Sequence, residues 1–173
     1  DQIGKSDTSI GNTSYLPKTA KRAMYVRIDW TKPVEESMVV IGEKYQLYRP
    51  SLKQAIIGST KQTKTSGAAG GALAFMSMSK AEIQSNYDVK YVGQEGVSGS
   101  VQTWHIFMTP RTSTSYKSAD LWVDSDGMPR QAMITENNGD TTTIVLAKIK
   151  KNDEVKTSEF SLDVPKGTKI ING

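Results

Sequence analysis

The side chains that could support catalysis are few in this 173-residue chain, and they are not grouped. His105 is the only histidine, and it lies in an apolar stretch with Trp104 and Phe107 nearby. A general base needs a positioned partner, and no neighbouring residue signals one. The chain has no cysteine, which excludes disulfides, thiol nucleophiles and Cys-ligated zinc. We therefore expect no catalytic residue, no metal site and no cofactor, and we do not expect an enzyme.

Two short motifs are similar to ligand-binding loops but lack the residues that would complete them. Segment 124–127, "DSDG", has no later acidic ligand at the EF-hand spacing, so its Asp-Gly pair predicts a hairpin turn. Segment 67–71, "GAAGG", lacks the Lys-Ser/Thr pair that reaches phosphate and magnesium in a phosphate loop. Since no serine elbow or paired carboxylates stand out either, the sequence favours binding over catalysis.

The dominant pattern is an alternation of residues that is typical of half-buried strands. In segment 23–30, "AMYVRIDW", Met24, Val26, Ile28 and Trp30 fall on one face. Further strands are predicted at 36–42, 43–50, 53–59, 88–95, 100–110, 119–125, 130–136, 140–150 and 158–164. Short strands joined by tight turns, such as Asn138-Gly139, predict a mainly β fold. We expect one antiparallel meander in a single domain spanning residues 1–173.

An apolar segment could cover such a sheet. A Gly-, Ser- and Thr-rich tract, 58–71, leads into "ALAFMSMSK" at 72–80, and the apolar residues there and at Ile83 suit a helix with one apolar face. We predict a short helix on a flexible tether, with Leu73, Phe75 and Met76 toward the sheet. The seven methionines also suit a surface that repacks around apolar ligands, while plain core filling stays open for each.

The net charge and the hydropathy of the chain limit the classes of partner that it can be expected to bind. The net charge of +4 and pI near 9.2 permit contact with anionic lipid or acidic partners. Lys and Arg are spread along the chain, so we expect no nucleic-acid partner. No apolar run approaches the roughly 18 residues of a membrane span, and no signal peptide is visible. We therefore predict a chain that does not span a membrane.

The order of these segments resembles the outer-membrane lipoprotein carrier family, the LolA-like proteins. The resemblance begins with "KRAMYVRIDWTKPVEESMVVIGEKYQLYRPSLKQAIIG" at 21–58. It continues through "WHIFMTPR", "LWVDSDGMPRQAMITENNGDTTTIVL" and "EFSLDVPKGTKII", and so spans nearly the whole chain. Only about two dozen residues precede Tyr25, whereas the family begins with a helix and an outer strand. We therefore expect the N-terminal helix region to be shortened or missing.

The resemblance implies a fold and a function. The implied fold is an incomplete, strongly curved antiparallel β-barrel, with lid helices around an apolar cavity. The implied function is that of a periplasmic, exported carrier that binds lipoprotein acyl chains and passes them toward the outer membrane. Its implied partners are lipoprotein acyl chains or other lipids, an inner-membrane exporter and an outer-membrane acceptor, and we expect a monomer. A regulatory domain of the same fold that senses lipid or lipoprotein is the alternative.

The resemblance and the strand alternation together identify candidate site residues. A family arginine that controls the lid corresponds best to Arg22, with Lys18 as the competitor. The predicted acyl cavity combines three lid residues with the inward face of the strands: Met24, Val26, Ile28, Trp30, Met38, Val40, Leu73, Phe75, Met76, Trp104, Ile106, Met108, Leu121, Val123, Ile144 and Leu146.

Overall fold

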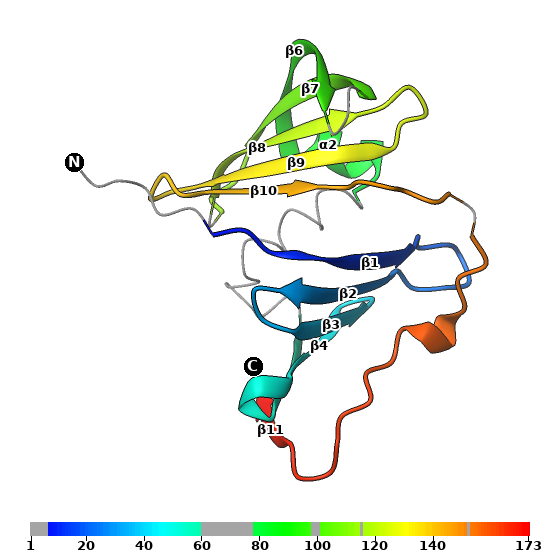
Figure 1. The fold of residues 1–173 in the computed structure, drawn as a ribbon. Helices are drawn as coiled ribbons and strands as arrows, with labels where there is room; N and C mark the ends of the chain where they lie inside the picture. Colours follow the sequence, from blue (N-terminus) through cyan, green and yellow to red (C-terminus); the bar gives the residue numbers. More distant parts are fainter. Residues whose placement is uncertain (1–6, 60–77, 98–100, 115, 152) are drawn as a thin grey trace. The chain divides into compact units, whose positions relative to one another are not determined.

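The computed structural model describes residues 7–59, 78–97, 101–114, 116–151 and 153–173 (Figure 1). The chain comprises two compact units. The first contains residues 1–63 and 152–173, and the second contains residues 64–151. Over the described ranges the fold is mainly β, as predicted, but it has one α-helix where several lid helices were expected. The single domain stays a prediction, and each unit is described by itself.

The first unit contains a six-stranded sheet. In spatial order its strands are β1 (Ile10–Leu16), β2 (Tyr25–Lys32), β3 (Glu36–Ile41), β4 (Lys44–Arg49), β5 (Gln54–Ser59) and β11 (Lys169–Asn172). A short 3-10 turn, η1 (Pro50–Leu52), joins β4 to β5. Strands β2 to β5 confirm the sequence prediction. Strand β1 was not predicted, and it supplies an outer strand antiparallel to β2.

The C-terminal part of this unit corrects the sequence prediction. The strand expected at 158–164 is wrong, because Thr157–Glu159 forms a 3-10 turn, η2, followed by irregular chain (Figure 1). The physical reason is that the Arg27 guanidinium occupies the carbonyls of Glu159 and Ser161, at 2.7 and 3.0 Å. Phe160 is buried there and makes an edge-on contact with Tyr25, at 5.3 Å between ring centroids. Backbone acceptors held by a side chain need no strand neighbour.

The second unit contains a five-stranded antiparallel sheet and the helix α2 (Lys80–Asn86). In spatial order the strands are β10 (Thr141–Val145), β9 (Pro129–Glu136), β8 (Tyr116–Val123), β7 (Val101–Pro110) and β6 (Tyr87–Val97). Gly127 and Gly139 have φ angles of 76° and 93°, which confirms both predicted hairpin turns. Strand β10 ends at Val145, so the strand predicted to reach residue 150 is shorter than expected.

Helix α2 begins with a capping box. The Ser79 side chain accepts from the Glu82 amide, and the Glu82 carboxylate accepts from the Ser79 amide at 2.8 Å. The predicted helix around 72–83 is thus described only in its last part, because residues 72–77 lie outside the described ranges. Ile83 packs against the core of the second unit. The buried residues of that core are Tyr87, Met108, Ala119, Leu121, Ala132 and Ile134.

The predicted single antiparallel meander needs two corrections. The described strands form two sheets, and neither sheet closes into a barrel. All strand pairs in the described ranges are antiparallel except β11 with β5, which are parallel. A parallel neighbour requires a long connection. Here, β11 follows β5 only after the entire second unit, so no local turn signal could reveal the pairing.

The turn between β8 and β9 is held by a buried carboxylate. Asp124 accepts from the amides of Asp126 and Met128 at 3.0 and 2.9 Å, and Arg130 pairs with it at 2.6 Å. Burial acts to raise the pKa of Asp124, but the Met128 amide, the Arg130 guanidinium and the Asp126 amide together hold it below its ordinary value. This is the hairpin expected from "DSDG", with an ionised anchor.

We expect Asp124→Ala to lower the free energy of unfolding by roughly 1–3 kcal/mol, because two amides and Arg130 lose their acceptor. The sign with pH follows from the lowered pKa of Asp124. Its contribution is present above the unfolded pKa of about 3.9 and is lost as pH falls through the lower folded value. Chemical denaturation from pH 3 to 7 measures both effects. Ser125→Ala, in the same turn, is the control, and equal losses in the two variants would contradict this account.

Candidate functional site: an apolar face on each sheet

The predicted residues of the first unit lie on one face of its sheet. Val26 is paired with Val40 and Ile28 with Met38, and residues directly opposite in an antiparallel pair share a face. Val26 and Ile28 are buried, whereas Met38 and Val40 are half-buried. Two residues of the same set, Met24 and Trp30, are also half-buried. The pairing of Met38 with Leu47, and of Leu47 with Ile56, extends this apolar face across β4 and β5.

The predicted residues of the second unit also share a face, and it is the face that packs against α2. Ile106 is paired with Leu121 and Trp104 with Val123. Leu121 and Ile144 both oppose Ala132. Met108 is fully buried and Leu121 nearly so, while Ile106, Val123, Ile144 and Leu146 are half-buried. The residues that strand alternation predicted for the cavity therefore all lie on the same side of this sheet.

Part of this second apolar face is open to solvent. Trp104 is 38% exposed, and Tyr91 on the edge strand β6 is 58% exposed. Tyr91 opposes Ile106 and Val89 opposes Met108, so both extend the same face from the buried core. We call Val89, Tyr91 and Trp104 the aromatic rim. It is accessible apolar surface that continues the core face, which suits contact with an apolar ligand.

The remaining predicted site residues are less informative. Leu73, Phe75 and Met76 lie outside the described ranges. Arg22 is half-buried, and its Nη2 donates to the Pro17 carbonyl at 3.2 Å, within the connection between β1 and β2. Its backbone also forms an isolated bridge with Thr19. The roles predicted for these residues stay predictions.

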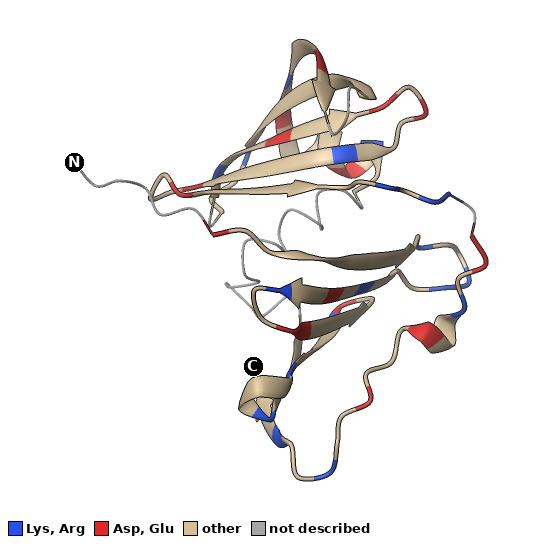
Figure 2. Ribbon diagram, in the orientation of Figure 1, with Lys and Arg blue, Asp and Glu red and all other residues tan. Residues whose placement is uncertain are grey.

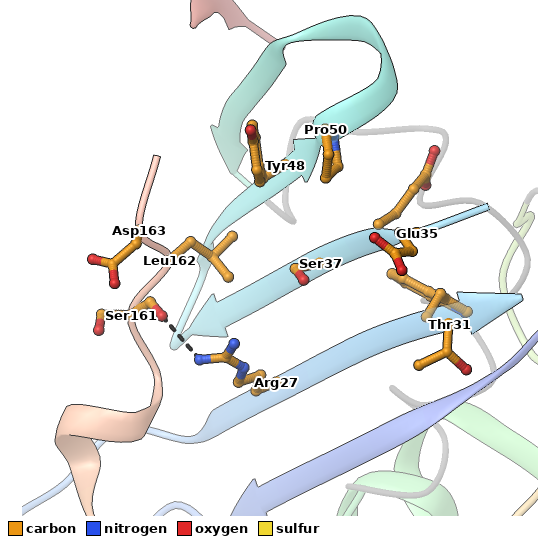
Figure 3. Close-up of a pocket in the computed structure, with 11 residues that line it drawn as sticks. Arg27, Thr31, Glu35, Ser37, Tyr48, Pro50, Ser161, Leu162 and Asp163 are labelled. Carbon is orange, nitrogen blue, oxygen red and sulfur yellow. Dashed lines mark hydrogen bonds between the residues drawn. The ribbon is translucent and has the colours of Figure 1, made fainter. Parts of the chain in front are cut away.

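A hollow of about 340 Å³ lies on the opposite face of the first unit's sheet (Figure 3). Arg27, Ser37 and Tyr48 line it from the sheet, and Ser161 and Asp163 line it from the C-terminal segment. Trp30, which was predicted to line the acyl cavity, also borders this hollow. Its lining is rich in charged and hydroxyl side chains, so it does not suit an acyl chain. The apolar faces, and not this hollow, are the better candidate for binding lipid.

Arg27 ties the C-terminal segment to the sheet. Its Nε and Nη2 donate to the two carboxylate oxygens of Asp29 at 2.7 and 3.1 Å, and Ser37 donates to the same carboxylate. Partial burial acts to raise the pKa of Asp29, but these hydrogen bonds lower it overall. Sequence reasoning missed this role, although Arg27 and Asp29 stand two apart on the polar face of their strand.

Charge is distributed evenly over the described chain. Figure 2 shows acidic and basic residues interspersed along the strands and loops of each unit. None of the described helices is long and apolar enough to cross a membrane.

Comparison with known families identifies the family to which this chain belongs. Residues 19–163 match the family described as "Outer membrane lipoprotein carrier protein LolA". The chain belongs to the LolA family. This match includes every predicted site residue, from Arg22 to Leu146. It confirms the resemblance drawn from the sequence.

Two curated members of the LolA family illustrate the distance of the relationship. The outer-membrane lipoprotein carrier protein of Pseudomonas fluorescens (strain Pf0-1) is 25% identical over 139 residues, which cover 80% of this chain and 63% of that protein. The protein of the same name from Pseudomonas paraeruginosa (strain DSM 24068 / PA7) is 25% identical over 166 residues, which cover 93% of this chain and 75% of that protein. This chain thus spans less than two thirds of the length of the first relative.

Solved structures show a similar fold. MucB superposes with a TM-score of 0.54 at 15% identity, covering 90% of this chain and 52% of MucB. An uncharacterised conserved protein from Thermus thermophilus superposes with a TM-score of 0.55 at 12% identity, and the match covers 86% of this chain and 75% of that protein. At these identities the likeness concerns the fold alone.

We expect Arg27→Leu to release the C-terminal segment, because it removes the donor to two carbonyls and leaves Asp29 without its guanidinium. The free energy of unfolding should fall by about 1–3 kcal/mol. Hydrogen exchange should show faster exchange in residues 157–164.

Arg111→Leu is the matched control, because its pair with Asp88 is exposed on both sides and should contribute about 0–1 kcal/mol. If 157–164 exchange equally in Arg27→Leu and Arg111→Leu, the tie described above does not hold the segment.

Proposed function

We propose that this chain binds the acyl chains of lipoproteins on the apolar faces of its sheets and carries them in the periplasm toward the outer membrane. The observation that supports this most is that residues selected by strand alternation share one face of each sheet, in a member of the LolA family. The aromatic rim offers accessible apolar surface next to a buried core. The incomplete barrel with lid helices and an apolar cavity is part of the proposal.

A carrier must also be able to release its acyl chains, so part of the binding free energy has to be opposed. Each buried CH₂ group contributes about 0.8 kcal/mol, so two or three acyl chains would bind too tightly to be released. A lid that opens, and a cavity that closes when it is empty, would oppose binding and permit transfer. Leu73, Phe75 and Met76 are the residues proposed for that lid. An inner-membrane exporter and an outer-membrane acceptor are the proposed partners, with a monomeric carrier between them.

The first test is whether the purified chain binds acyl chains at all. Mass spectrometry of extracted lipid, and titration with a fluorescent fatty acid, measure binding. We expect Trp104→Glu to weaken binding at least about tenfold, because it places a charge on the apolar face. Since Trp104 is 38% exposed, the fold should survive the change.

The control for this test is Val145→Glu. Val145 is 47% exposed and opposes Gln131, whereas its neighbour Ile144 opposes Ala132 on the apolar face. This control adds the same charge to the other side of the same sheet. Equal affinity for Trp104→Glu and the unaltered chain would remove the second unit's face from the proposed site.

The second test concerns Arg22. We propose that its guanidinium stabilises the empty, closed state through hydrogen bonds to backbone carbonyls of the lid. The bond to the Pro17 carbonyl shows that a backbone carbonyl is within its reach, but it is local to the β1–β2 connection. Arg22→Leu should then tighten acyl binding by the worth of such bonds, on the order of 1–3 kcal/mol, and slow transfer to acceptor vesicles. Affinity and transfer rate are measured beside Lys18→Leu. Changes of less than a few-fold in Arg22→Leu would dismiss this role while leaving the carrier function in place.

The transfer assay also addresses the alternative left open by the sequence. A sensing or regulatory domain would use the same apolar faces to detect lipid. Acyl binding without transfer to any acceptor would therefore favour sensing over carriage.

A further inference from the structure

A polar cluster around the only histidine lies on the face of the second sheet that is opposite α2 and the core. His105 Nδ1 is 2.8 Å from Glu95 Oε1, and His105 Nε2 is 2.7 Å from Asp120 Oδ1. The imidazole stacks on the Trp122 indole, with ring centroids 4.2 Å apart and planes at 17°. The indole Nε1 in turn donates to Glu95 Oε2 at 3.0 Å. Three adjacent strands, β6, β7 and β8, are joined through one ring.

The two carboxylate contacts have a chemical consequence. A neutral imidazole carries one N–H and one lone pair, whereas an imidazolium carries an N–H on both nitrogens. With a carboxylate oxygen within 2.8 Å of each nitrogen, a neutral ring would point its lone pair at one of them. Only an imidazolium donates a hydrogen bond to both carboxyl groups at once. Asp120 is 7% exposed, so water cannot readily replace the missing donor.

The surrounding charges are consistent with that state. On β6, the charged residues on the same face as His105 are Glu95 and Lys90, which lies opposite Phe107. On β8 the nearest is Asp120, and Asp124 follows the end of that strand. Asp124 is neutralised by Arg130. Hydrogen bonds from Trp122 and His105 hold the pKa of Glu95 below its ordinary value, which keeps that carboxylate charged.

We propose that His105 is held as an imidazolium that clamps β6, β7 and β8 together, and that loss of its proton as pH rises loosens this end of the sheet. The clamp lies near the end of β6 at Val97, away from the end at Tyr87 where α2 ends. A folded chain that retains a proton which the unfolded chain releases is stabilised at low pH. That stabilisation is then lost as pH rises.

The charge state can be measured directly, because the single histidine gives a single pair of ring signals. In the full chain labelled with ¹⁵N-histidine, we expect two protonated ring nitrogens with similar shifts at about pH 7.5. An unperturbed histidine, with a pKa of about 6.5, would be mostly neutral at that pH. Widely separated shifts of the two ring nitrogens would mark a neutral imidazole, whether or not Asp120 is protonated, and would overturn the proposal.

Two variants separate the clamp from ordinary packing. Glu95→Gln removes one carboxylate and should make His105 lose its proton at lower pH than in the unaltered chain. Asp88→Asn removes a carboxylate from the same strand that does not contact the ring, and it should leave the titration unchanged. Equal titrations in the two variants would contradict a role for Glu95.

The stability consequence is tested by denaturation of the unaltered chain and of His105→Gln. The ratio of their folding equilibrium constants should be several-fold larger at pH 6 than at pH 9, with the unaltered chain favoured at the lower pH. Exchange of the β6 and β7 amides, corrected for intrinsic rates, should accelerate with pH only when His105 is present. A ratio that does not change with pH would reject the clamp.

Discussion

Cross-strand register is the constraint on which the rest of this structure depends. Because successive side chains of a strand point to opposite faces, a shift of one residue would carry every apolar residue to the wrong side. In the second unit the pairing of Ile106 with Leu121, and of Leu121 with Ala132, places a run of apolar side chains under α2. In the first unit the pairing of Ile28 with Met38 gathers the apolar side chains of that sheet on one face. The proposed lipid-binding surface is a direct product of these registers.

The opposite faces of the two sheets add polar links to their apolar packing, which includes Val39 on the first sheet and Trp122 on the second. On the first sheet, Arg27 joins Asp29 to the carbonyls of Glu159 and Ser161, and so holds a segment that is distant in sequence. On the second sheet, His105 joins Glu95 to Asp120 across three strands. Polar contacts of this type specify which strands and segments lie together, while the apolar faces supply most of the burial free energy.

The proposed binding of acyl chains requires an adaptable apolar surface and no catalytic group. The apolar faces combine fully buried residues such as Met108 with exposed ones such as Tyr91 and Trp104. The buried part stabilises the sheet, and the exposed part is available to a ligand without unfolding it. The residues suited to acid-base chemistry, His105 and its two carboxylates, are instead engaged with one another on the other face. This division agrees with a carrier family in which burial, and not bond making, performs the function.

The sequence by itself determined the mainly β fold, strands β2 to β5, both Asp/Asn-Gly hairpins, the apolar faces and the family. These features depend on contacts within a few residues, or on the two-residue period of a strand, which are visible along the chain. Only the tertiary structure decided that residues 158–164 are not a strand, that β11 pairs in parallel with β5, and that His105 has two carboxylate partners. Glu95 and Asp120 stand ten and fifteen residues from His105, and Glu159 stands 132 residues from Arg27. No local pattern encodes such pairs, because they exist only once the strands have been set side by side.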